Sequence, residues 1–267
     1  MEDIKSIYFH NPTPDGLEKC IVWLQKNGYH FISDCELFDI LTIKKTIEKK
    51  LAFLSFDDAW KSNLDFIPII EKYKVPITIF VPIEPLTSGN YWWDYARDDA
   101  PAFKELGYEE FLRRVDALKC KMSLKRTCMT VDDIKRLSYH PLVSLQAHTI
   151  SHPILTKLPD DIVRREILES KTILEEIIGK EVRFFSYPNG SYGKRELEIV
   201  SNCFDMAFSI KMRHIKLTDN ICELPRIGFT GDYYKDIIKY FGYWPLLKKI
   251  LFFVTRKENF KLQKELE

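Results

Sequence analysis

LAFLSFDD, residues 51–58, is a nearly all-apolar run that ends in two acidic residues. Such runs are typical of a parallel strand that is buried on both faces of a sheet. PITIFV, residues 76–81, repeats the pattern after a helical stretch at 64–73. Because strands alternate with helices, the sequence predicts a parallel α/β fold, in which catalytic groups come from the carboxyl ends of strands.

The alternation continues on both sides of these two strands. Further strands are expected at residues 4–10, 29–33, 143–146, 183–186 and 206–209, and helices at 17–27, 36–49, 102–120, 131–138 and 160–178. Residues 82–99 contain aromatics and turn formers and are expected to form a loop. We therefore predict one domain over residues 1–235, followed by an amphipathic helical tail over 236–267.

Composition and charge exclude several classes of protein. The chain has 267 residues, of which 45% are hydrophobic and 30% charged, so intrinsic disorder is excluded as its main state. Lys and Arg number 40 against 39 Asp and Glu, which leaves a net charge of +1 and no basic field that would gather nucleic acid. Binding to DNA or RNA is not expected.

Targeting signals and cysteine usage lead us to expect a cytoplasmic protein. We find no secretory signal after Met1, and the apolar run at 250–254 is far shorter than the roughly 20 residues that span a bilayer. The six cysteines contain no CxxC pair, as expected for reduced thiols. The tail mixes apolar and basic residues, so it could lie on the inner membrane surface, or pack on the barrel or another subunit. Its sequence does not decide the oligomeric state.

A candidate metal site follows from two separated segments. Asp57 and Asp58 would repel each other unless a metal ion or a basic group stood near them, although Asp58 could instead cap the next helix. His148 and His152 stand four apart, on one face if that segment is helical. Two histidines and one carboxylate form a divalent-metal site with open positions for water. The histidines alone could equally be exposed groups without a role.

Four motifs occur in order: SFDDAW at 55–60, AHTISH at 147–152, FFSYPNGSYG at 184–193 and LPRIGF at 224–229. With these motifs the chain resembles the NodB-homology polysaccharide deacetylases, the fourth carbohydrate esterase family, over about residues 4–230. The opening at 7–33 is similar to the branch that deacetylates poly-N-acetylglucosamine, which carries its general-acid histidine near the N-terminus. The resemblance implies a distorted (β/α) barrel of mostly parallel strands.

The resemblance also implies the parts of a hydrolytic site. Asp58, His148 and His152 would hold one divalent metal ion, zinc first, with cobalt, nickel, manganese or iron as alternatives. Asp57 would be the general base that takes a proton from water. The backbone N–H that stabilises the oxyanion lies in the motif at 187–190, where Asn189 is the best match.

The leaving group needs a proton, and two positions depart from the family pattern. His10 is expected to protonate the departing amine, although it could instead cap the barrel. Ala59 stands where a glycine is usual, and Ser186 where an arginine usually braces the base. Arg226 could supply that cation through a bidentate contact with Asp57, or could lie in a surface ion pair.

Sugar sites present aromatic faces to the pyranose ring. The candidates for substrate binding are Trp60, Trp92, Trp93 and Tyr187, and each tryptophan could equally be structural. His30, His140 and His214 match no motif, and His214 is expected to be exposed.

The leading hypothesis is a metal-dependent hydrolase that removes N-acetyl groups from an amino-sugar glycan or a lipid-linked glycan precursor. One alternative is hydrolysis of another C–N amide bond. The other is a catalytically silent barrel that binds glycan or acts as a scaffold, which Ala59 and Ser186 would favour. The joint presence of both aspartates with His10, His148 and His152 favours the enzyme.

Overall fold

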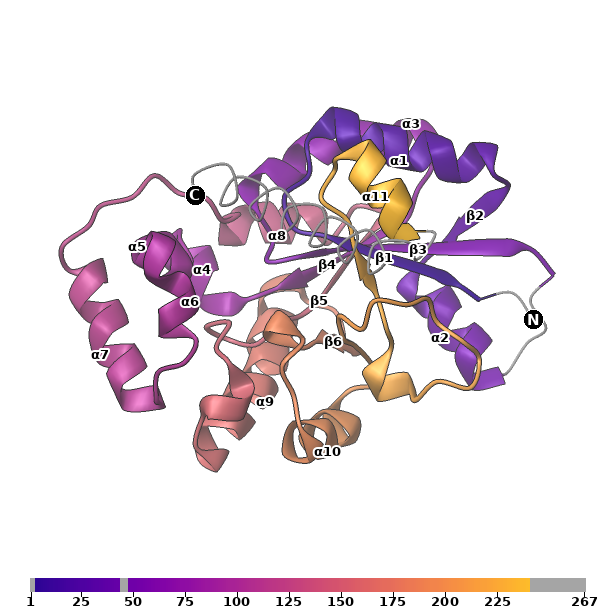
Figure 1. Cartoon of the computed structure of the whole chain (residues 1–267). Coiled ribbons are helices and arrows are strands. Elements are labelled where there is room, and N and C mark those ends of the chain that lie inside the picture. The colour runs from indigo at the N-terminus through magenta and orange to yellow at the C-terminus, as the bar shows by residue number, and fades with distance from the viewer. Residues whose placement is uncertain (1–2, 44–47, 241–267) are drawn as a thin grey trace, which may run out of the picture.

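A curled parallel sheet forms the centre of the molecule. The computed structural model of the chain describes residues 3–43 and 48–240. The strands are β1 (Lys5–Phe9), β2 (Tyr29–Ile32), β3 (Lys50–Asp57), β4 (Ile77–Val81), β5 (Val143–Ala147), β6 (Phe184–Ser186), β7 (Met206–Phe208) and β8 (Ile227–Gly228). They pair in parallel in the order β7-β6-β5-β4-β3-β1-β8, with β2 beside β3 (Figure 1). The sheet curves without closing, because β7 and β8 stand at its two ends, and the expected distorted (β/α) barrel is confirmed.

The strand β3 shows how alternation along the chain orients the site. Successive side chains of a strand point to opposite faces. Leu54 and Phe56 pack in the large core that includes residues of the surrounding helices, whereas Phe53 belongs to a second core inside the curl. The rings of Phe53 and Phe208 stack there at 5.1 Å between centroids. Ser55 and Asp57 lie on the same inward face of β3 as Phe53. The acidic end of β3 therefore follows the aromatic residues of the second core.

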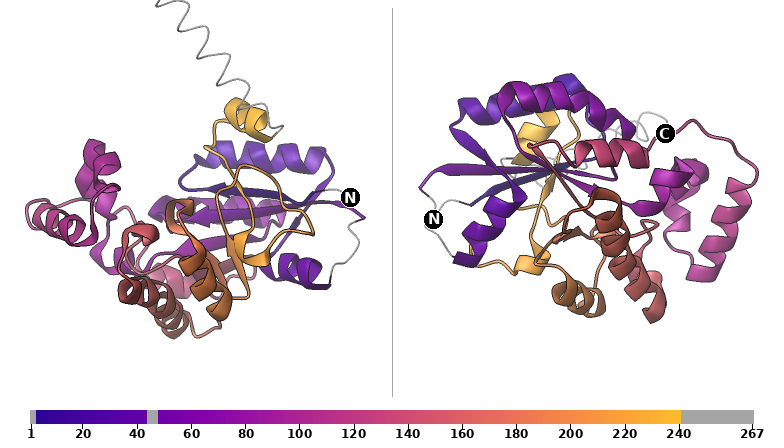
Figure 2. Two further views of the ribbon diagram at one scale, coloured as in Figure 1. Left: turned by 60° about the horizontal axis from the view of Figure 1, so that its bottom comes forward. Right: turned by 180° about the vertical axis from the view of Figure 1, so that it is seen from behind.

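Helices surround this sheet (Figures 1 and 2). They are α1 (Pro14–Lys26), α2 (Asp34–Ile43), α3 (Ile67–Tyr73), α8 (Val131–Leu137), α9 (Asp160–Ile178), α10 (Lys194–Cys203) and α11 (Tyr233–Tyr240). α9 has the bounds predicted from its periodicity, and it ends where Gly179 adopts a left-handed conformation. α2 begins at Asp34, two residues before the expected start, and is described as far as Ile43; α10 was not expected from the sequence. The helix expected at 64–73 begins as a 3-10 turn, Lys61–Phe66, that leads into α3.

Four short helices form an excursion between β4 and α8, residues 82–130. They are α4 (Ile83–Ser88), α5 (Trp92–Ala96), α6 (Ala100–Phe103) and α7 (Tyr108–Lys119), and Figure 2 shows them standing to one side of the sheet. The prediction of a loop at 82–99 was therefore wrong, and the helix expected at 102–120 is interrupted before Tyr108. The physical reason is a small core of its own, in which Trp92 packs with Phe103 and Val115.

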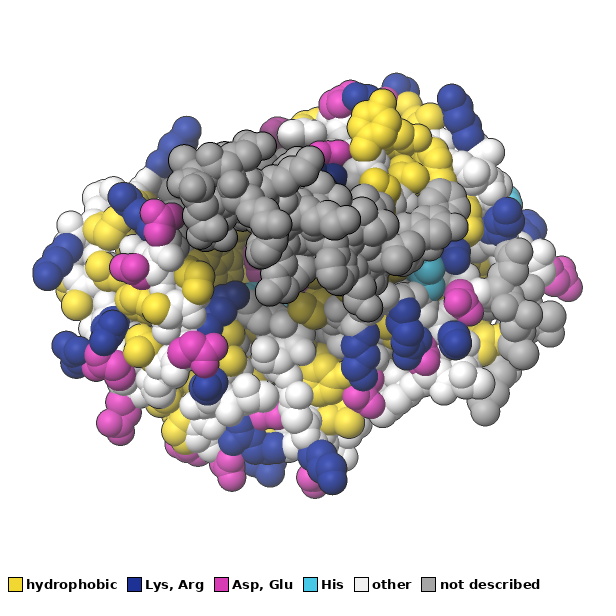
Figure 3. All heavy atoms as spheres, in the orientation of Figure 1, with side chains coloured by type: hydrophobic (Ala, Val, Ile, Leu, Met, Phe, Trp, Pro, Cys, Tyr) yellow, Lys and Arg dark blue, Asp and Glu magenta, His cyan; other side chains and the backbone are white. Residues whose placement is uncertain are grey.

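The expected tail is described only at its beginning. α11 covers residues 233–240 and contacts α1, and the remaining residues of the tail, 241–267, lie outside the described part of the chain. Apolar side chains gather on the surface over α1 and α11, where Tyr234 is exposed (Figure 3). Among residues 3–43 and 48–240, no helix combines the length and the apolar character needed to cross a membrane.

Candidate active site

The carboxyl ends of several strands bring the predicted residues to one edge of the sheet. Asp57 is the last residue of β3 and Asp58 follows it, His148 follows β5, and His10 follows β1. Parallel strands all present the same end at this edge, so groups that are far apart in the sequence meet there.

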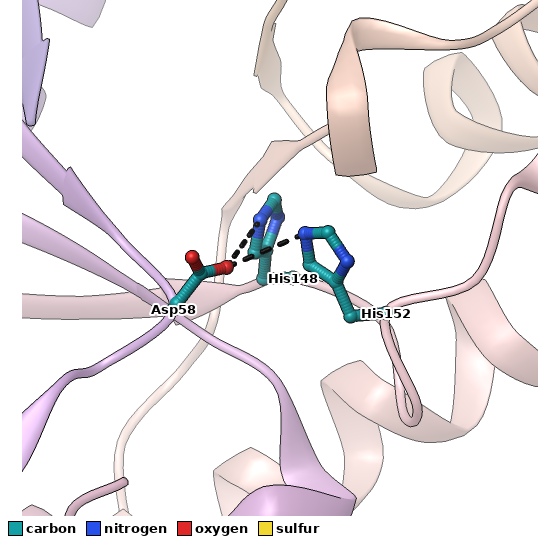
Figure 4. A group of neighbouring side chains, drawn as sticks. All are labelled: Asp58, His148 and His152. Carbon is teal, nitrogen blue, oxygen red and sulfur yellow. Dashed lines mark ion pairs between the residues drawn. The ribbon is translucent and has the colours of Figure 1, made fainter. Parts of the chain in front are cut away.

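Asp58, His148 and His152 form a compact buried group (Figure 4). Oδ1 of Asp58 lies 3.6 Å from Nε2 of His148 and 3.3 Å from Nε2 of His152. One potential ligand atom from each residue lies within 4.8 Å of the others. Within the described residues, Oδ1 of Asp58 has no hydrogen-bond partner although it is buried. A buried carboxylate oxygen that faces two imidazole nitrogens without a donor fits a divalent cation.

The protonation states of the two histidines fit a cation as well. Nδ1 of His148 lies 2.7 Å from the carbonyl oxygen of Ser186, which can only accept, so Nδ1–H donates and Nε2 keeps its lone pair toward Asp58. Burial lowers the pKa of His152 to about 4, so its imidazole is neutral near pH 7, as a metal ligand must be. Burial alone would raise the pKa of Asp58, but the nearby imidazoles hold it below its ordinary range.

The segment that carries the two histidines is a loop, and the helical arrangement considered from their spacing was wrong. Thr149 and His152 both have left-handed backbone, with φ of 67° and 55°. Oγ1 of Thr149 accepts the N–H of His152 at 3.1 Å. Glu166, a buried residue of α9, accepts the N–H groups of Ile150 and Ser151, each at 2.9 Å. These contacts hold the loop in a conformation that an isolated chain would rarely adopt.

Arg226 forms a two-pronged ion pair with Asp57. Its two terminal nitrogens lie 2.8 Å and 2.9 Å from the two carboxylate oxygens. They also donate to the hydroxyls of Ser55 and Ser186, at 2.9 Å and 2.6 Å. The arginine is 0% exposed, so the alternative of a surface ion pair was wrong. Burial would raise the pKa of Asp57, but Arg226 and then His148 lower it, so this carboxylate is ionised at neutral pH.

The two departures from the family pattern have local structural accounts. Ser186 is small and lies on β6. Its hydroxyl accepts a hydrogen bond from the guanidinium of Arg226, the residue just before β8. Ala59 has a φ of 54° and is completely buried, which is a left-handed conformation that glycine adopts at lower cost. Asp58 beside it is also left-handed, with a φ of 77°.

Two adjoining cavities lie over this edge of the sheet. The larger, of about 520 Å³, is lined by His10, Asp57, His148, His152 and Asn189, among others. The smaller, of about 320 Å³, adds Asp58, Trp60 and Trp93. The His10 side chain is 53% exposed, and its Nε2 lies 3.9 Å from Oδ2 of Asp58. The structure therefore places the predicted acid at the mouth of the site, facing the Asp-His-His group.

Asn189 lies in the turn after β6. Its backbone is left-handed, with a φ of 53°. Its side-chain oxygen accepts from Nζ of Lys104 at 2.6 Å, and both residues line both cavities. Lys104 follows α6, so this hydrogen bond joins the β4–α8 excursion to the barrel across the mouth of the site.

The aromatic candidates divide into two pairs. Trp60 donates its indole N–H to Oδ2 of Asp58 at 3.2 Å, and Trp93 stacks on Tyr91 with centroids 4.5 Å apart; both tryptophans line the smaller cavity. Trp92 and Tyr187 are only 4% and 1% exposed. The expectation that these two rings face a substrate was wrong, because each packs in the core and donates to a backbone carbonyl.

Other positions also differ from the sequence interpretation. His214, expected to be exposed, is 8% exposed and packs against Tyr240 with ring centroids 5.4 Å apart. Sequence reasoning did not find Lys104 or Glu166. Glu166 adjoins Ile167 on the buried face of α9, and a charged residue at an apolar position of a helical pattern was an available signal. Lys104 gave no such signal.

Comparisons with known proteins agree with this geometry. A family model described as "Polysaccharide deacetylase" matches residues 44–203. YxkH of Bacillus subtilis (strain 168), whose name describes it as a polysaccharide deacetylase, is 24% identical over 177 residues, which are 66% of this chain and 50% of that protein. The chain thus spans about half the length of this curated relative.

Solved structures share the fold. The Streptococcus pyogenes deacetylase PplD, in complex with acetate, superposes with a TM-score of 0.65 at 19% identity, over 86% of this chain and 94% of that one. IcaB from Ammonifex degensii superposes with a TM-score of 0.65 at 17% identity, over 90% of this chain and 97% of that one. The family model covers more than half of the sequence, and the chain belongs to the polysaccharide deacetylase family.

Proposed function

We propose that this chain is a metal-dependent hydrolase that removes N-acetyl groups from an amino-sugar glycan or a lipid-linked glycan precursor. The observation that carries the proposal is the pairing of a buried, arginine-held carboxylate with the adjacent Asp-His-His group. Family membership and the name of the relative YxkH support an acetylated sugar as the substrate. The similarity of residues 7–33 to the poly-N-acetylglucosamine branch supports N-acetylglucosamine as the acetylated unit of that substrate.

Asp58, His148 and His152 would hold the metal ion, with zinc as the first choice for this donor set. When bound, the cation supplies Lewis acidity for the acetyl carbonyl and lowers the pKa of water. The protein keeps the two histidines in the protonation states that binding requires, through the hydrogen bond of His148 to Ser186 and the burial of His152.

Asp57 would take the proton of the attacking water. A base must be ionised before the reaction, and the two contacts from Arg226 favour that form. They also fix the orientation of the carboxylate, since a two-pronged contact restricts its rotation.

His10 would return a proton to the sugar nitrogen as the C–N bond breaks, which makes the amine a competent leaving group. Its position at the mouth of the cavity suits a group that must meet the substrate and exchange protons with solvent. The backbone N–H of Asn189 would stabilise the oxyanion of the tetrahedral intermediate. Trp60 and Trp93 would offer aromatic surface to the sugar ring.

The test is metal analysis of purified wild type and His148→Ala, followed by acetate release from N-acetylglucosamine oligomers with and without a chelator. We expect about one divalent metal ion per wild-type chain, loss of that metal in the variant, and acetate release that the chelator stops. Asp57→Asn is the matched control, because it should keep the metal and lose the turnover.

Other outcomes would overturn parts of the proposal. Bound metal without acetate release from any N-acetylated sugar would favour hydrolysis of another C–N amide bond. Absence of metal from both proteins would favour a silent glycan-binding barrel.

A further inference from the structure

We propose that Lys104 forms an anion subsite at the rim of the active site, so that the preferred substrate is an N-acetylated sugar with a phosphate or carboxylate group near the reacting acetamide. This inference rests on the proposed function and narrows its substrate class. It starts from the position of Lys104, which lines both cavities together with His10, His152 and Asn189. A group bound at Lys104 therefore shares one cavity with the reacting centre.

The charge of Lys104 has no ionic partner within residues 3–43 and 48–240. Its partner there is the neutral side-chain oxygen of Asn189, at 2.6 Å. The nearby carboxylates are committed elsewhere, because Asp57 pairs with Arg226 and Glu105 pairs with Lys157. A partly buried ammonium whose hydrogen-bond partner is an amide oxygen is stabilised more by an anionic ligand than by a neutral one.

The hydrogen-bonding capacity at this rim points to the same ligand chemistry. An ammonium carries three donors and no acceptor, so two of the Lys104 donors are free of the Asn189 contact. Nδ2 of Asn189 is a further donor; it is buried and has no hydrogen-bond partner in the described part of the chain. The acceptor of the same amide is already used by Lys104. Donors without acceptors select a ligand that is rich in acceptors, such as a phosphate or a carboxylate.

The contact between Lys104 and Asn189 also holds the lysine in place. Lys104 belongs to the β4–α8 excursion and Asn189 to the turn after β6. The ammonium is therefore fixed over the cavity by a residue of the barrel, which reduces the conformational freedom that the side chain would lose on binding an anion.

The test is calorimetric titration of the metal-loaded protein with N-acetylglucosamine, N-acetylglucosamine 1-phosphate and N-acetylmuramic acid. We expect the wild type to bind the phosphate sugar about tenfold more tightly than the neutral sugar at low salt. Lys104→Gln, which keeps a donor for Asn189, should lose most of this preference, so that its affinities for the phosphate sugar and for the neutral sugar become similar. Comparison of the phosphate sugar with the carboxylate sugar identifies which anion the subsite prefers.

Lys157→Gln is the matched control. Lys157 lines the same cavity but already pairs with Glu105 at 3.4 Å, so its loss should change the preference less than about twofold. A wild type without preference for either anion, or an equal loss in the two variants, would overturn the inference.

Acetate release measured on the same proteins separates this inference from the proposed function. A wild type that releases no acetate but shows the Lys104-dependent preference would contradict the deacetylase and leave the subsite standing. Acetate release at the same rate from anionic and neutral sugars, and at the same rate by the wild type and Lys104→Gln, would contradict the subsite alone.

Discussion

Trp92 donates its indole N–H to the backbone carbonyl of His152 at 2.9 Å. The contact joins α5 of the excursion to the loop that carries a metal-ligand candidate, across sixty positions of sequence. The buried indole ring thus helps to hold the backbone of His152 in place, whereas Trp92 is expected from the sequence to contact the sugar.

Trp92→Phe should lower the free energy of unfolding by about 1–2 kcal/mol, because the buried carbonyl of His152 loses its donor while most of the ring volume stays. Urea denaturation of the metal-free protein measures the change. Trp93→Phe is the control, since Trp93 is more exposed and stacks on Tyr91 through its face. Equal losses in the two variants would argue against a role for the hydrogen bond.

Glu166→Ala should weaken metal binding by about 10–100-fold, the usual range for loss of a residue that orients a ligand. The two N–H groups of Ile150 and Ser151 would lose their acceptor, and the loop would no longer hold His152 toward Asp58. Competition with a coloured zinc chelator measures the affinity. Glu166→Gln keeps an acceptor oxygen and should bind metal within about tenfold of the wild type. If Glu166→Ala loses stability but keeps its metal affinity, the residue is only structural.

Arg226→Lys should reduce acetate turnover by at least about tenfold while the metal content stays near the wild-type value. A lysine cannot reproduce the two-pronged contact, so Asp57 would keep a nearby charge but lose its fixed orientation. Elemental analysis and acetate release on one preparation make the comparison. Arg183→Lys, in the more exposed pair with Asp205, should change turnover less than about twofold. Unchanged turnover in Arg226→Lys would remove the bracing role.

His214 should make the protein sensitive to acid. Burial lowers its pKa to about 4, so below pH 6.5 the unfolded chain takes up a proton that the folded protein refuses until about pH 4. Stability is therefore complete above pH 6.5 and falls as the pH drops through this window. The wild type should lose up to about 3 kcal/mol more than His214→Gln between pH 7 and pH 4. Urea denaturation at several pH values measures the free energy of unfolding of both proteins. Equal losses in the wild type and His214→Gln would contradict the role of His214.

The parallel barrel and part of the candidate site can be predicted from local sequence patterns. β3 and β4 are recognisable because strands buried on both faces are continuously apolar, and Asp57, Asp58 and His148 are predictable because polar residues end such strands. His152 is proposed from its spacing of four from His148 and from the family motif, but its approach to Asp58 depends on left-handed backbone that spacing does not encode.

What the sequence could not decide depends on distant contacts. A buried Arg226 and a surface Arg226 look alike in a sequence, because the difference is made by Ser55 and Asp57, which lie about 170 positions earlier. From the sequence, Trp92 is interpreted as an aromatic residue of a loop, because its packing against Phe103 and Val115 is formed only in the folded protein. Short helices such as α4 and α5 also carry too few residues for a periodic pattern to emerge.

If the proposed metal ion binds, the left-handed residues of the site connect its affinity to folding. Asp58, Thr149 and His152 hold positive φ angles without being glycine, and the unfolded chain rarely visits that geometry at several positions together. The disordered chain should therefore bind the cation far more weakly than the native one does, so occupancy draws the folding equilibrium toward the native state by mass action. A chelator that removed the proposed ion would then lower the free energy of unfolding.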